Sequence, residues 1–396
     1  MALFEHPRCA ACGRESVIDL LDVAEVPAYC NVLWSHREQA HAAKRGAMSL
    51  KYCQACAHVF NALYDPGLTD YTPSYDNSLH FSPQFNRFAA ELAANLVERY
   101  DLHGGTLVEI GCGKGDFLVQ LCERGKNCGW GFDRSFDPDR VDKARRQQIN
   151  FVQDFYTAEH AGRLRPDFVC CRHVLEHIAD PRSFLDELRR GFADRADAAL
   201  YFEVPNALFT LKDMGIWDLI YEHCGYYTLS SLSGAVASSG FDVVAMGETF
   251  DEQFIFVEMR PGTGRVRGAV PETHLPANVG RYANQFAERY REKVLYWQER
   301  SRDLKKAARA AVVWGGGSKG VTFLNALGRE SGIDYVVDLN PHKQGKYVAG
   351  TGQLVVSPEF LLKLRPTDVI VMNPIYENEI ADSLQALGLD ARLWCV

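Results

Sequence analysis

The chain has 396 residues, about twice the usual size of one domain, so two or three domains are expected. Hydrophobic residues make up 47% of it and charged residues 24%, the balance of a globular protein with real apolar cores. The formal net charge of -8 argues against a general nucleic-acid binder, which usually carries a basic face. No apolar run is long enough to cross a bilayer and no signal-peptide pattern opens the chain, so we expect a cytoplasmic protein with reduced cysteines.

Two CxxC pairs lie near the start of the chain, separated by about forty residues. Zn²⁺ binds four thiolates in a tetrahedron, and each CxxC turn supplies two of them. We therefore predict a zinc-binding N-terminal domain over residues 1–70, in which the metal is structural. The alternative is four reduced cysteines without metal. The predicted ligands are Cys9, Cys12, Cys53 and Cys56, and less favoured substitutes are Cys30, His6 and His58.

Strand and helix patterns alternate through the next part of the chain. Apolar side chains at helical spacing predict a helix over residues 81–102, and a strand, a glycine turn and a helix follow over residues 106–125. This alternation predicts a doubly wound parallel α/β sheet of the Rossmann type, which we place at residues 71–262. Further strands are predicted at residues 127–135, 150–156, 167–175, 198–206 and 240–261, and a further helix at residues 181–192.

The last third of the chain begins with a Gly- and Pro-rich stretch, GTGRVRGAVPETHLPANVG, which reads as a linker. A long charged helix follows, and we assign residues 263–305 to the linker and this helix. AAVVWGGGSKGVTFLNAL then starts a second strand, glycine turn and helix. Residues 306–396 are therefore predicted to form a second, smaller Rossmann-like α/β domain.

The most informative motif is VEIGCGKG at residues 108–115. Its glycines let the chain turn sharply after a strand and approach a ligand closely. The motif resembles that of the class I S-adenosylmethionine-dependent methyltransferases, and the resemblance covers roughly residues 80–260. Dinucleotide sites keep a third glycine further along, and its absence here argues against a nicotinamide cofactor. The resemblance implies that the methionine part contacts Glu109, Gly111 and Gly113, the ribose contacts Asp133, and the adenine contacts Asp154 and Phe155.

The order of the three parts is more specific than the core alone. Two CxxC pairs, a methyltransferase core, and the C-terminal stretches GGGSKG and DLNPHKQGKYVAGT resemble the sugar C-methyltransferases, which act on nucleotide-linked keto-deoxysugars. This resemblance spans nearly the whole chain. It implies methyl transfer to a carbon that a neighbouring ketone acidifies.

The stretch IYEHCGYY at residues 220–227 sets a carboxylate and an imidazole beside phenols. Carbon methylation needs a base of pKa near neutrality and donors for the enolate oxygen. We assign His223 as the base and Glu222 as the group that orients a ring or a substrate hydroxyl. His177, in HVLEHIADP, faces the reaction centre in similar enzymes or packs at a helix start. The candidate phenols are Tyr75, Tyr221, Tyr226 and Tyr227, the last two also as substrate contacts.

Other interpretations of these residues stay open. YEHCGYY is also compatible with a capped turn packed on the sheet. Ile220 stands where the sugar enzymes carry a tyrosine, which leaves room for an oxygen or nitrogen acceptor. A methyltransferase-like protein that binds without catalysis is a further alternative, and a zinc-ribbon RNA methyltransferase is disfavoured by the acidic balance. We expect a small-molecule substrate, without nucleic acid or membrane as partner.

The C-terminal glycine turn, WGGGSKG, is a candidate phosphate site. Successive backbone N–H groups at a helix start suit a phosphate, and Lys319 adds a positive charge. Gly316 and Lys319 are therefore the predicted contacts of a nucleotide diphosphate. The alternative is a turn kept only for packing. Asn340, Lys343 and Lys346 read as loop residues in solvent.

Overall fold

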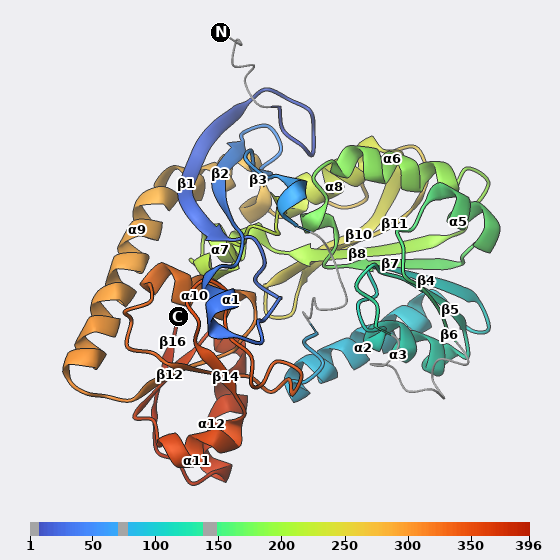
Figure 1. Cartoon of the computed structure of the whole chain (residues 1–396). Coiled ribbons are helices and arrows are strands. Elements are labelled where there is room, and N and C mark those ends of the chain that lie inside the picture. The colour runs from blue at the N-terminus through green and yellow to red at the C-terminus, as the bar shows by residue number, and fades with distance from the viewer. Residues whose placement is uncertain (1–7, 70–77, 138–148) are drawn as a thin grey trace.

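A computed structural model describes residues 8–69, 78–137 and 149–396 of the chain. The chain forms three sheets, one for each predicted part, and the long helix α9 (Pro276–Lys306) runs along the outside of the molecule (Figure 1). The predicted fold class, a doubly wound sheet with a smaller N-terminal unit and a second α/β unit, is confirmed. Within the described residues, no helix combines the length and the apolar composition that a membrane crossing requires.

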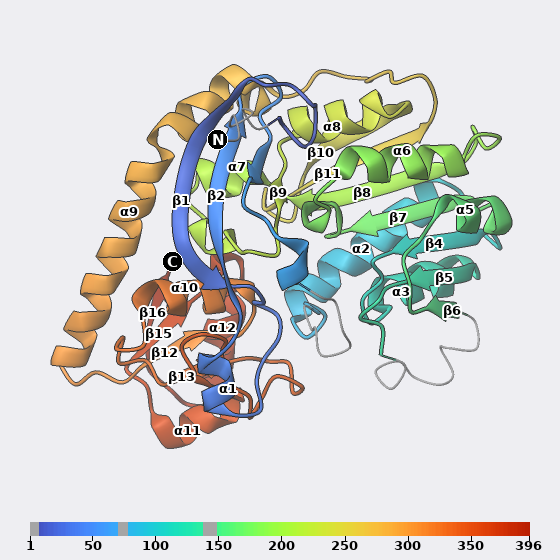
Figure 2. The ribbon, with the colours of Figure 1, turned by 45° about the horizontal axis from the view of Figure 1, so that its top comes forward.

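The first sheet is antiparallel and has the strand order β1-β2-β3-β9. Its last strand comes from far along the chain, because β9 (Gly225–Tyr226) pairs with β3 (Val59–Asn61). The predicted base-bearing stretch therefore runs into the N-terminal sheet, as Figure 2 shows. The sequence pattern had not indicated this strand. The remaining elements are β1 (Val17–Pro27), α1 (Arg37–His41), β2 (Arg45–Cys53) and η1 (Pro66–Leu68).

The second sheet has seven strands in the order β10-β11-β8-β7-β4-β5-β6, in which β11 alone runs antiparallel to its neighbours β10 and β8. Its strands are β4 (Thr106–Ile110), β5 (Cys128–Phe132), β6 (Ile149–Val152), β7 (Phe168–Arg172), β8 (Ala199–Pro205), β10 (Phe241–Thr249) and β11 (Phe254–Pro261). Its helices are α2 (Pro83–Arg99), α3 (Asp116–Gly125), α5 (Ala158–Leu164), α6 (Pro181–Gly191), α7 (Ala207–Leu211) and α8 (Leu229–Ser238), with short turns η3 (Leu175–His177) and η4 (Ile216–Asp218).

The third sheet is entirely parallel, in the order β14-β13-β12-β15-β16. Its strands are β12 (Ala311–Trp314), β13 (Tyr335–Val337), β14 (Leu354–Val356), β15 (Asp368–Val371) and β16 (Arg392–Cys395). Its helices are α10 (Ser318–Leu327), α11 (Leu361–Leu364) and α12 (Glu377–Ala386), with short turns η6 (Pro358–Phe360) and η7 (Pro374–Tyr376).

Local sequence signals explain where the site-forming helices begin. Ser82 caps α2 by accepting a hydrogen bond from the N–H of Phe85, and Pro83 occupies the first helical position, where its missing N–H costs nothing. Pro276 starts α9 in the same way, after the short turn η5 (Glu272–His274). The predicted helix over residues 81–102 is therefore confirmed with tighter bounds.

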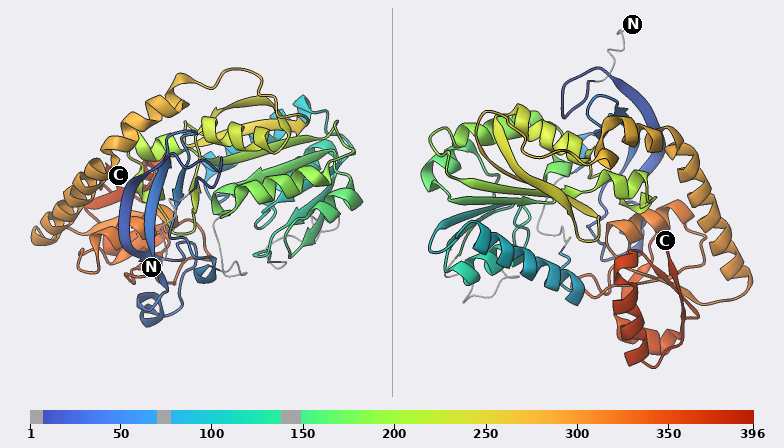
Figure 3. Two further views of the ribbon diagram at one scale, coloured as in Figure 1. Left: turned by 90° about the horizontal axis from the view of Figure 1, so that it is seen from above. Right: turned by 180° about the vertical axis from the view of Figure 1, so that it is seen from behind.

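One buried apolar cluster joins the first and third sheets. It contains Leu50 and Tyr52 from β2, Trp217 from η4, Phe286 from α9 and Phe323 from α10. The rings of Trp217 and Phe323 meet edge-on, with centroids 4.9 Å apart. The view from behind in Figure 3 shows α9 spanning from the first sheet to the third. This shared core holds the third domain against the carboxyl edge of the second sheet, where ligands of open α/β sheets bind.

Candidate functional site

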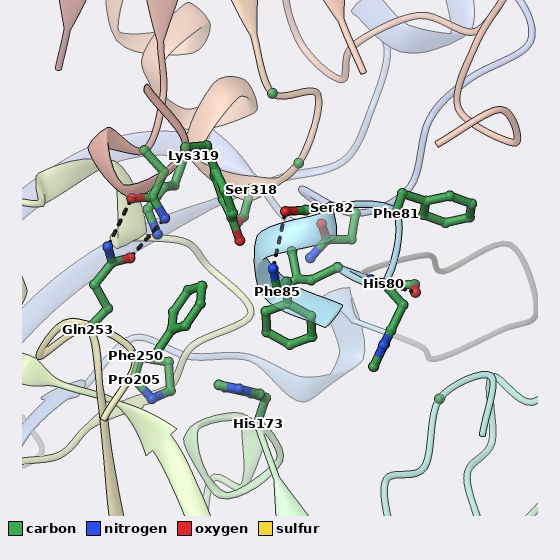
Figure 4. A pocket seen from close by; sticks show the side chains of 18 of the residues that line it. His80, Phe81, Ser82, Phe85, His173, Pro205, Phe250, Gln253, Ser318 and Lys319 are labelled. Carbon is green, nitrogen blue, oxygen red and sulfur yellow. Dashed lines mark hydrogen bonds between the residues drawn. The ribbon is translucent and has the colours of Figure 1, made fainter. Parts of the chain in front are cut away.

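A cavity of about 340 Å³ lies between the second sheet and the C-terminal domain. One wall comes from the loops that follow β4, β7 and β8, and the opposite wall comes from the loops that follow β12, β13 and β15. The start of α2 closes a third side (Figure 4). Both α/β domains thus offer the carboxyl ends of their strands to a single cavity.

The glycine loop after β4 forms part of this wall. Gly111, Gly113 and Gly115 have φ values of 70°, 55° and 84°, a region that favours glycine. A Cβ on Gly111 would lie 2.1 Å from the Cγ2 of Val174, so that position has no room for a side chain. The N–H of Gly113 donates to Asp133 Oδ2 at 2.8 Å. The glycines at these positions and the contact with Asp133 therefore fix the conformation of the loop.

Glu109 lies beneath this loop and is only 4% exposed. Its Oε2 has no hydrogen-bond partner among the described residues. Burial raises the pKa of Glu109 to about 8, although the nearby Arg172 acts in the opposite direction. A buried acceptor without a partner, lining a cavity, suits the amino group of a ligand.

Arg172, His173 and Glu203 form a buried network at the end of β7 that the sequence reading had missed. Arg172 Nε donates to Glu203 Oε1 at 2.9 Å, and His173 Nε2 lies 3.1 Å from the same oxygen. Burial acts to raise the pKa of Glu203, but Arg172 and His173 lower it to about 2. Burial acts to lower the pKa of His173, but Glu176 and Glu203 raise it above its usual value. His173 also has a φ of 55°, a strained conformation that turns its ring toward the cavity (Figure 4).

His177 and His223 meet in the cavity wall, with ring centroids 4.9 Å apart at a steep angle. His177 Nδ1 lies 2.9 Å from the carbonyl oxygen of Glu222, so it carries the proton and leaves Nε2 as an acceptor. His223 Nδ1 has no hydrogen-bond partner among the described residues. Burial lowers the pKa of both imidazoles, and the proximity of His177, His173 and Lys319 lowers that of His223 further. Both rings are therefore neutral near pH 7.

Glu222 and its neighbouring tyrosines do not line this cavity. Glu222 is fully buried and accepts a hydrogen bond from the N–H of Cys30 at 2.7 Å. Tyr221 packs against Gly46 and accepts from the N–H of Asp65 at 2.8 Å. Packing contacts thus surround Glu222 and Tyr221 in the structure.

The other two phenols also lie in the packed core. Tyr226 donates to the carbonyl oxygen of Ile220 at 3.2 Å. Tyr227 is fully buried with its ring 4.5 Å from that of His58. The alternative of a packed turn describes these tyrosines, while His223 from the same stretch reaches the cavity. Tyr75, the remaining candidate phenol, lies outside the described residues.

The three residues expected around ribose and adenine lie beyond the cavity lining. Asp133 Oδ1 accepts from the N–H and the hydroxyl of Ser135, at 2.6 and 2.7 Å, so both carboxylate oxygens brace the turn. Asp154 accepts from the N–H of Phe155, whose ring is 59% exposed with Arg134 5.2 Å from its centroid. Their cofactor roles stay predictions.

The glycine loop after β12 has the same arrangement as the loop after β4, in which a glycine N–H donates to an aspartate. The N–H of Gly316 donates to Asp338 Oδ2 at 2.9 Å, and Asp338 Oδ1 accepts from the N–H of Asn340 at 2.8 Å. Lys319 lines the cavity and forms an ion pair with Asp218 at 2.7 Å. Lys343, expected in solvent, is buried instead and lies 3.7 Å from Asp338.

Polar contacts close the cavity between the two domains. Gln253 and Asn373 exchange two amide hydrogen bonds, of 3.0 and 2.8 Å. Glu379 Oε2 accepts from the hydroxyl of Ser82 at 2.9 Å and from the N–H of Gln84 at 3.1 Å. Figure 4 shows Gln253 and Ser82 at the edge of the cavity. Residues this far apart in the chain carry no local signal of such pairing.

The four predicted zinc ligands come together in the N-terminal domain. Cys9 Sγ lies 3.6 Å from Cys56 Sγ, and Cys12 Sγ lies 3.7 Å from Cys53 Sγ. Zn–S bonds of about 2.3 Å would place the sulfurs of a tetrahedron about 3.8 Å apart, so the arrangement fits Zn²⁺. All twelve cysteines are free thiols. Cys30 and His58 lie outside this cluster, and His6 lies outside the described residues.

Comparison with protein families agrees with this architecture. Residues 84–246 match the model described as a methyltransferase domain. The chain carries a methyltransferase domain. Residues 272–392 match the model described as a C-methyltransferase C-terminal domain, so the cavity lies between two units of named families. The predicted order of a methyltransferase core followed by a C-terminal α/β unit is thereby confirmed.

Curated relatives share only part of this chain. A ubiquinone biosynthesis O-methyltransferase of Escherichia fergusonii is 34% identical over 89 residues, which are 21% of this chain and 36% of that protein. Its counterpart in Escherichia coli K12 is 33% identical over the same length. The chain thus spans about a third of the length of these relatives.

Solved structures give a weaker similarity. The magnesium protoporphyrin IX methyltransferase of Synechocystis PCC 6803, with bound SAH, is 20% identical with a TM-score of 0.35, over 45% of this chain and 84% of that chain. A 1,6-didemethyltoxoflavin-N1-methyltransferase of Burkholderia thailandensis is 14% identical with a TM-score of 0.35, over 46% and 81%. Scores this low carry no conclusion about the methyltransferase domain here.

Proposed function

We propose that this protein is a cytoplasmic S-adenosylmethionine-dependent methyltransferase that methylates the carbon next to a ketone on a nucleotide-linked deoxysugar. The observation that carries the proposal is the shared cavity. It brings the glycine loop of a methyltransferase domain, two neutral imidazoles and the glycine loop of a C-methyltransferase C-terminal domain to one place.

The cofactor half of the cavity fits the methionine end of S-adenosylmethionine. The unpartnered Oε2 of Glu109 would accept from the amino group, and Gly111 and Gly113 leave the close approach that a side chain would block. Bound S-adenosylmethionine supplies an electrophilic methyl group on a positively charged sulfur. Asp133, Asp154 and Phe155 remain the proposed contacts of ribose and adenine.

His223 acts as the base in this proposal. Its Nδ1 carries an unshared electron pair, and its lowered pKa keeps the ring neutral and ready to accept a proton. The proton leaves the carbon beside the ketone, and the electron pair of that C–H bond forms the enolate. Bound S-adenosylmethionine would supply the methyl group to this carbon, and its sulfur would keep the electrons of the broken S–CH₃ bond. His173, whose pKa Glu176 and Glu203 raise although burial acts to lower it, lines the same cavity.

The C-terminal half of the cavity suits a nucleotide. The Gly316–Asp338 contact repeats the Gly113–Asp133 contact, so both domains present a braced glycine loop at the carboxyl end of a strand. Such loops present backbone N–H groups to phosphates. Lys319 stands at this loop and supplies a positive charge.

Methylation of oxygen or nitrogen on another small molecule is the second candidate. The observation that favours it is the 34% identity of an 89-residue segment to an O-methyltransferase. A protein that binds the cofactor without using it is the third. It has less support, because the glycine loop, Glu109 and the histidine pair are all in place.

The experiment that tests the proposal is mass spectrometry of thymidine- and cytidine-diphosphate keto-sugars after incubation with enzyme and S-adenosylmethionine that carries a deuterated methyl. We expect one labelled methyl per product, placed on carbon by NMR. A label on oxygen or nitrogen would select the second candidate. Cofactor binding by calorimetry without transfer to any keto-sugar would rule out this substrate class.

A further inference from the structure

Two lysine–aspartate pairs line the C-terminal end of the cavity. Lys319 Nζ lies 2.7 Å from Asp218 Oδ2, and Lys343 Nζ lies 3.7 Å from Asp338 Oδ2. All four side chains are largely buried, with 8 to 20% of each exposed. The positive charges that would receive a phosphate are therefore already balanced in the protein.

The two aspartates differ in what else they hold. Asp338 also accepts from the N–H groups of Gly316 and Asn340. Moving Asp338 away from Lys343 would therefore break the hydrogen bonds that hold the glycine loop in place. Asp218 lies at the end of η4, on the side of the methyltransferase domain. Among the described residues, its carboxylate has hydrogen-bond and ion-pair contacts with Lys319 alone. Of the two ion pairs, only the one between Asp218 and Lys319 can break without disrupting the conformation of the glycine loop.

A phosphate that binds the glycine loop must contend with the Asp218 carboxylate. Two like charges a few ångströms apart in a largely buried site repel strongly, so the lysine cannot hold both anions equally well. A diphosphate, with more charge and more acceptor oxygens than a single phosphate, competes better for Lys319 and for the loop N–H groups.

We propose that Asp218 is a built-in counter-ion of Lys319 that the substrate displaces, and that the cost of displacing it sets an affinity threshold that a diphosphate passes and a single phosphate does not. The proposal rests on the nucleotide-linked substrate proposed above. Every anion must break the ion pair at the same cost. A single phosphate then binds too weakly to occupy the site at concentrations at which a diphosphate, which makes more contacts, still binds. Asp218 thus sets the affinity of the site for anions from the wall opposite the glycine loop.

The test compares the full-length wild type with Asp218→Asn by calorimetry, using inorganic pyrophosphate, inorganic phosphate and thymidine diphosphate as probes. Asp213→Asn is the matched control, since Asp213 pairs with Lys212 at 3.5 Å on the surface and lies outside the cavity lining. We expect Asp218→Asn to bind phosphate about tenfold more tightly, a change of ~1.4 kcal/mol. Pyrophosphate binding should tighten by a similar factor, and the control should match the wild type.

Unchanged or weaker phosphate binding by Asp218→Asn overturns the proposal, provided that its melting temperature and its affinity for S-adenosylhomocysteine match the wild type. Asp218→Ser is the second variant if the first one folds poorly. Failure of the proposed function gives a different pattern. In that case no keto-sugar is methylated, while the phosphate affinities still shift in Asp218→Asn.

Discussion

At the scale of single residues, the proposed chemistry depends on a pair of histidines. His223 and His177 meet at a steep angle in the cavity wall, and neither ring is charged near pH 7 because burial lowers both pKa values. His177 Nδ1 donates to the carbonyl oxygen of Glu222, and His223 Nδ1 has no hydrogen-bond partner among the described residues. Such an arrangement can take up a proton without first losing one.

We predict that His223→Gln lowers kcat by about 10²- to 10⁴-fold, the usual contribution of a positioned base. Cys224→Ala is the control, since Cys224 is the next residue in the chain but does not line the cavity. Rates of methyl transfer and of solvent exchange at the substrate carbon are the measurements. Exchange that persists at the wild-type rate in His223→Gln would assign the base to another group.

The buried carboxylate of Glu203 predicts a pH dependence of stability. Its folded pKa of about 2 lies below the unfolded value near 4.5, so its ionised form stabilises the folded state above pH 4.5. This contribution, about 3 kcal/mol, is lost as the pH falls from about 4.5 to 2. Urea unfolding between pH 7 and pH 3 should show the loss.

Glu203→Gln provides the comparison for that experiment. The variant is less stable at pH 7, because it leaves Arg172 buried without its carboxylate. Its stability should then fall less steeply in acid than that of the wild type. Equal acid slopes for the two proteins would show that other carboxylates account for the loss.

How far single residues can be predicted from the sequence depends on whether the signal is local. Glu109, Gly111 and His223 stand in short motifs, and the structure places all three in the cavity lining. Asp218 and Glu203 carry no such motif, because their partners lie on other elements. A local sequence pattern does not indicate contacts between residues that lie far apart in the chain.

At the scale of elements, the glycine loop after β4 depends on two positions for different reasons. Gly111 has both a positive φ and a neighbour, Val174, in the place where a side chain would go. Gly113 also has a positive φ, but a Cβ there would meet nothing within 4 Å. A side chain at Gly113 would therefore cause backbone strain alone, while a side chain at Gly111 would cause both backbone strain and a steric clash.

We predict that Gly113→Ala costs about 1 kcal/mol of stability, the strain of a left-handed alanine. Gly111→Ala should cost about 3 kcal/mol or more and weaken binding of S-adenosylhomocysteine, because its Cβ meets Val174. Chemical unfolding and calorimetry are the measurements. A second substitution, Val174→Ala, should restore part of the loss in Gly111→Ala, and equal costs for the two single variants would contradict the argument.

Most elements could be predicted because their signals are periodic. The helix α2, the strand β4 with its glycine loop, and the long helix α9 all follow from spacing, caps and glycines. The strand β9 escaped prediction because two residues carry no period. It exists as a strand only because β3 offers it an edge.

At the scale of the whole molecule, the four-cysteine cluster and the stretch that carries the proposed base belong to one unit. Cys53 and Cys56 precede β3, and β3 pairs with β9, which begins two residues after His223. Loss of the metal should therefore disturb the base while leaving the glycine loop after β4 in place.

We predict that Cys56→Ser lowers the zinc content well below one per chain and lowers methyl transfer strongly, while S-adenosylhomocysteine binding is largely retained. Cys395→Ser is the control, because Cys395 is exposed and remote from the cluster. Elemental analysis, turnover and calorimetry give the three readouts. Full zinc occupancy in Cys56→Ser, or full turnover without zinc, would contradict this coupling.

The late strand β9 also has a consequence for the order of folding. As the chain leaves the ribosome, the three strands β1, β2 and β3 and both cysteine pairs emerge long before residues 225–226. Until then the edge of β3 stays open, and an open edge can pair with another chain. The four thiols can come together before that edge is covered, so the cysteine cluster can form before the strand that completes its sheet.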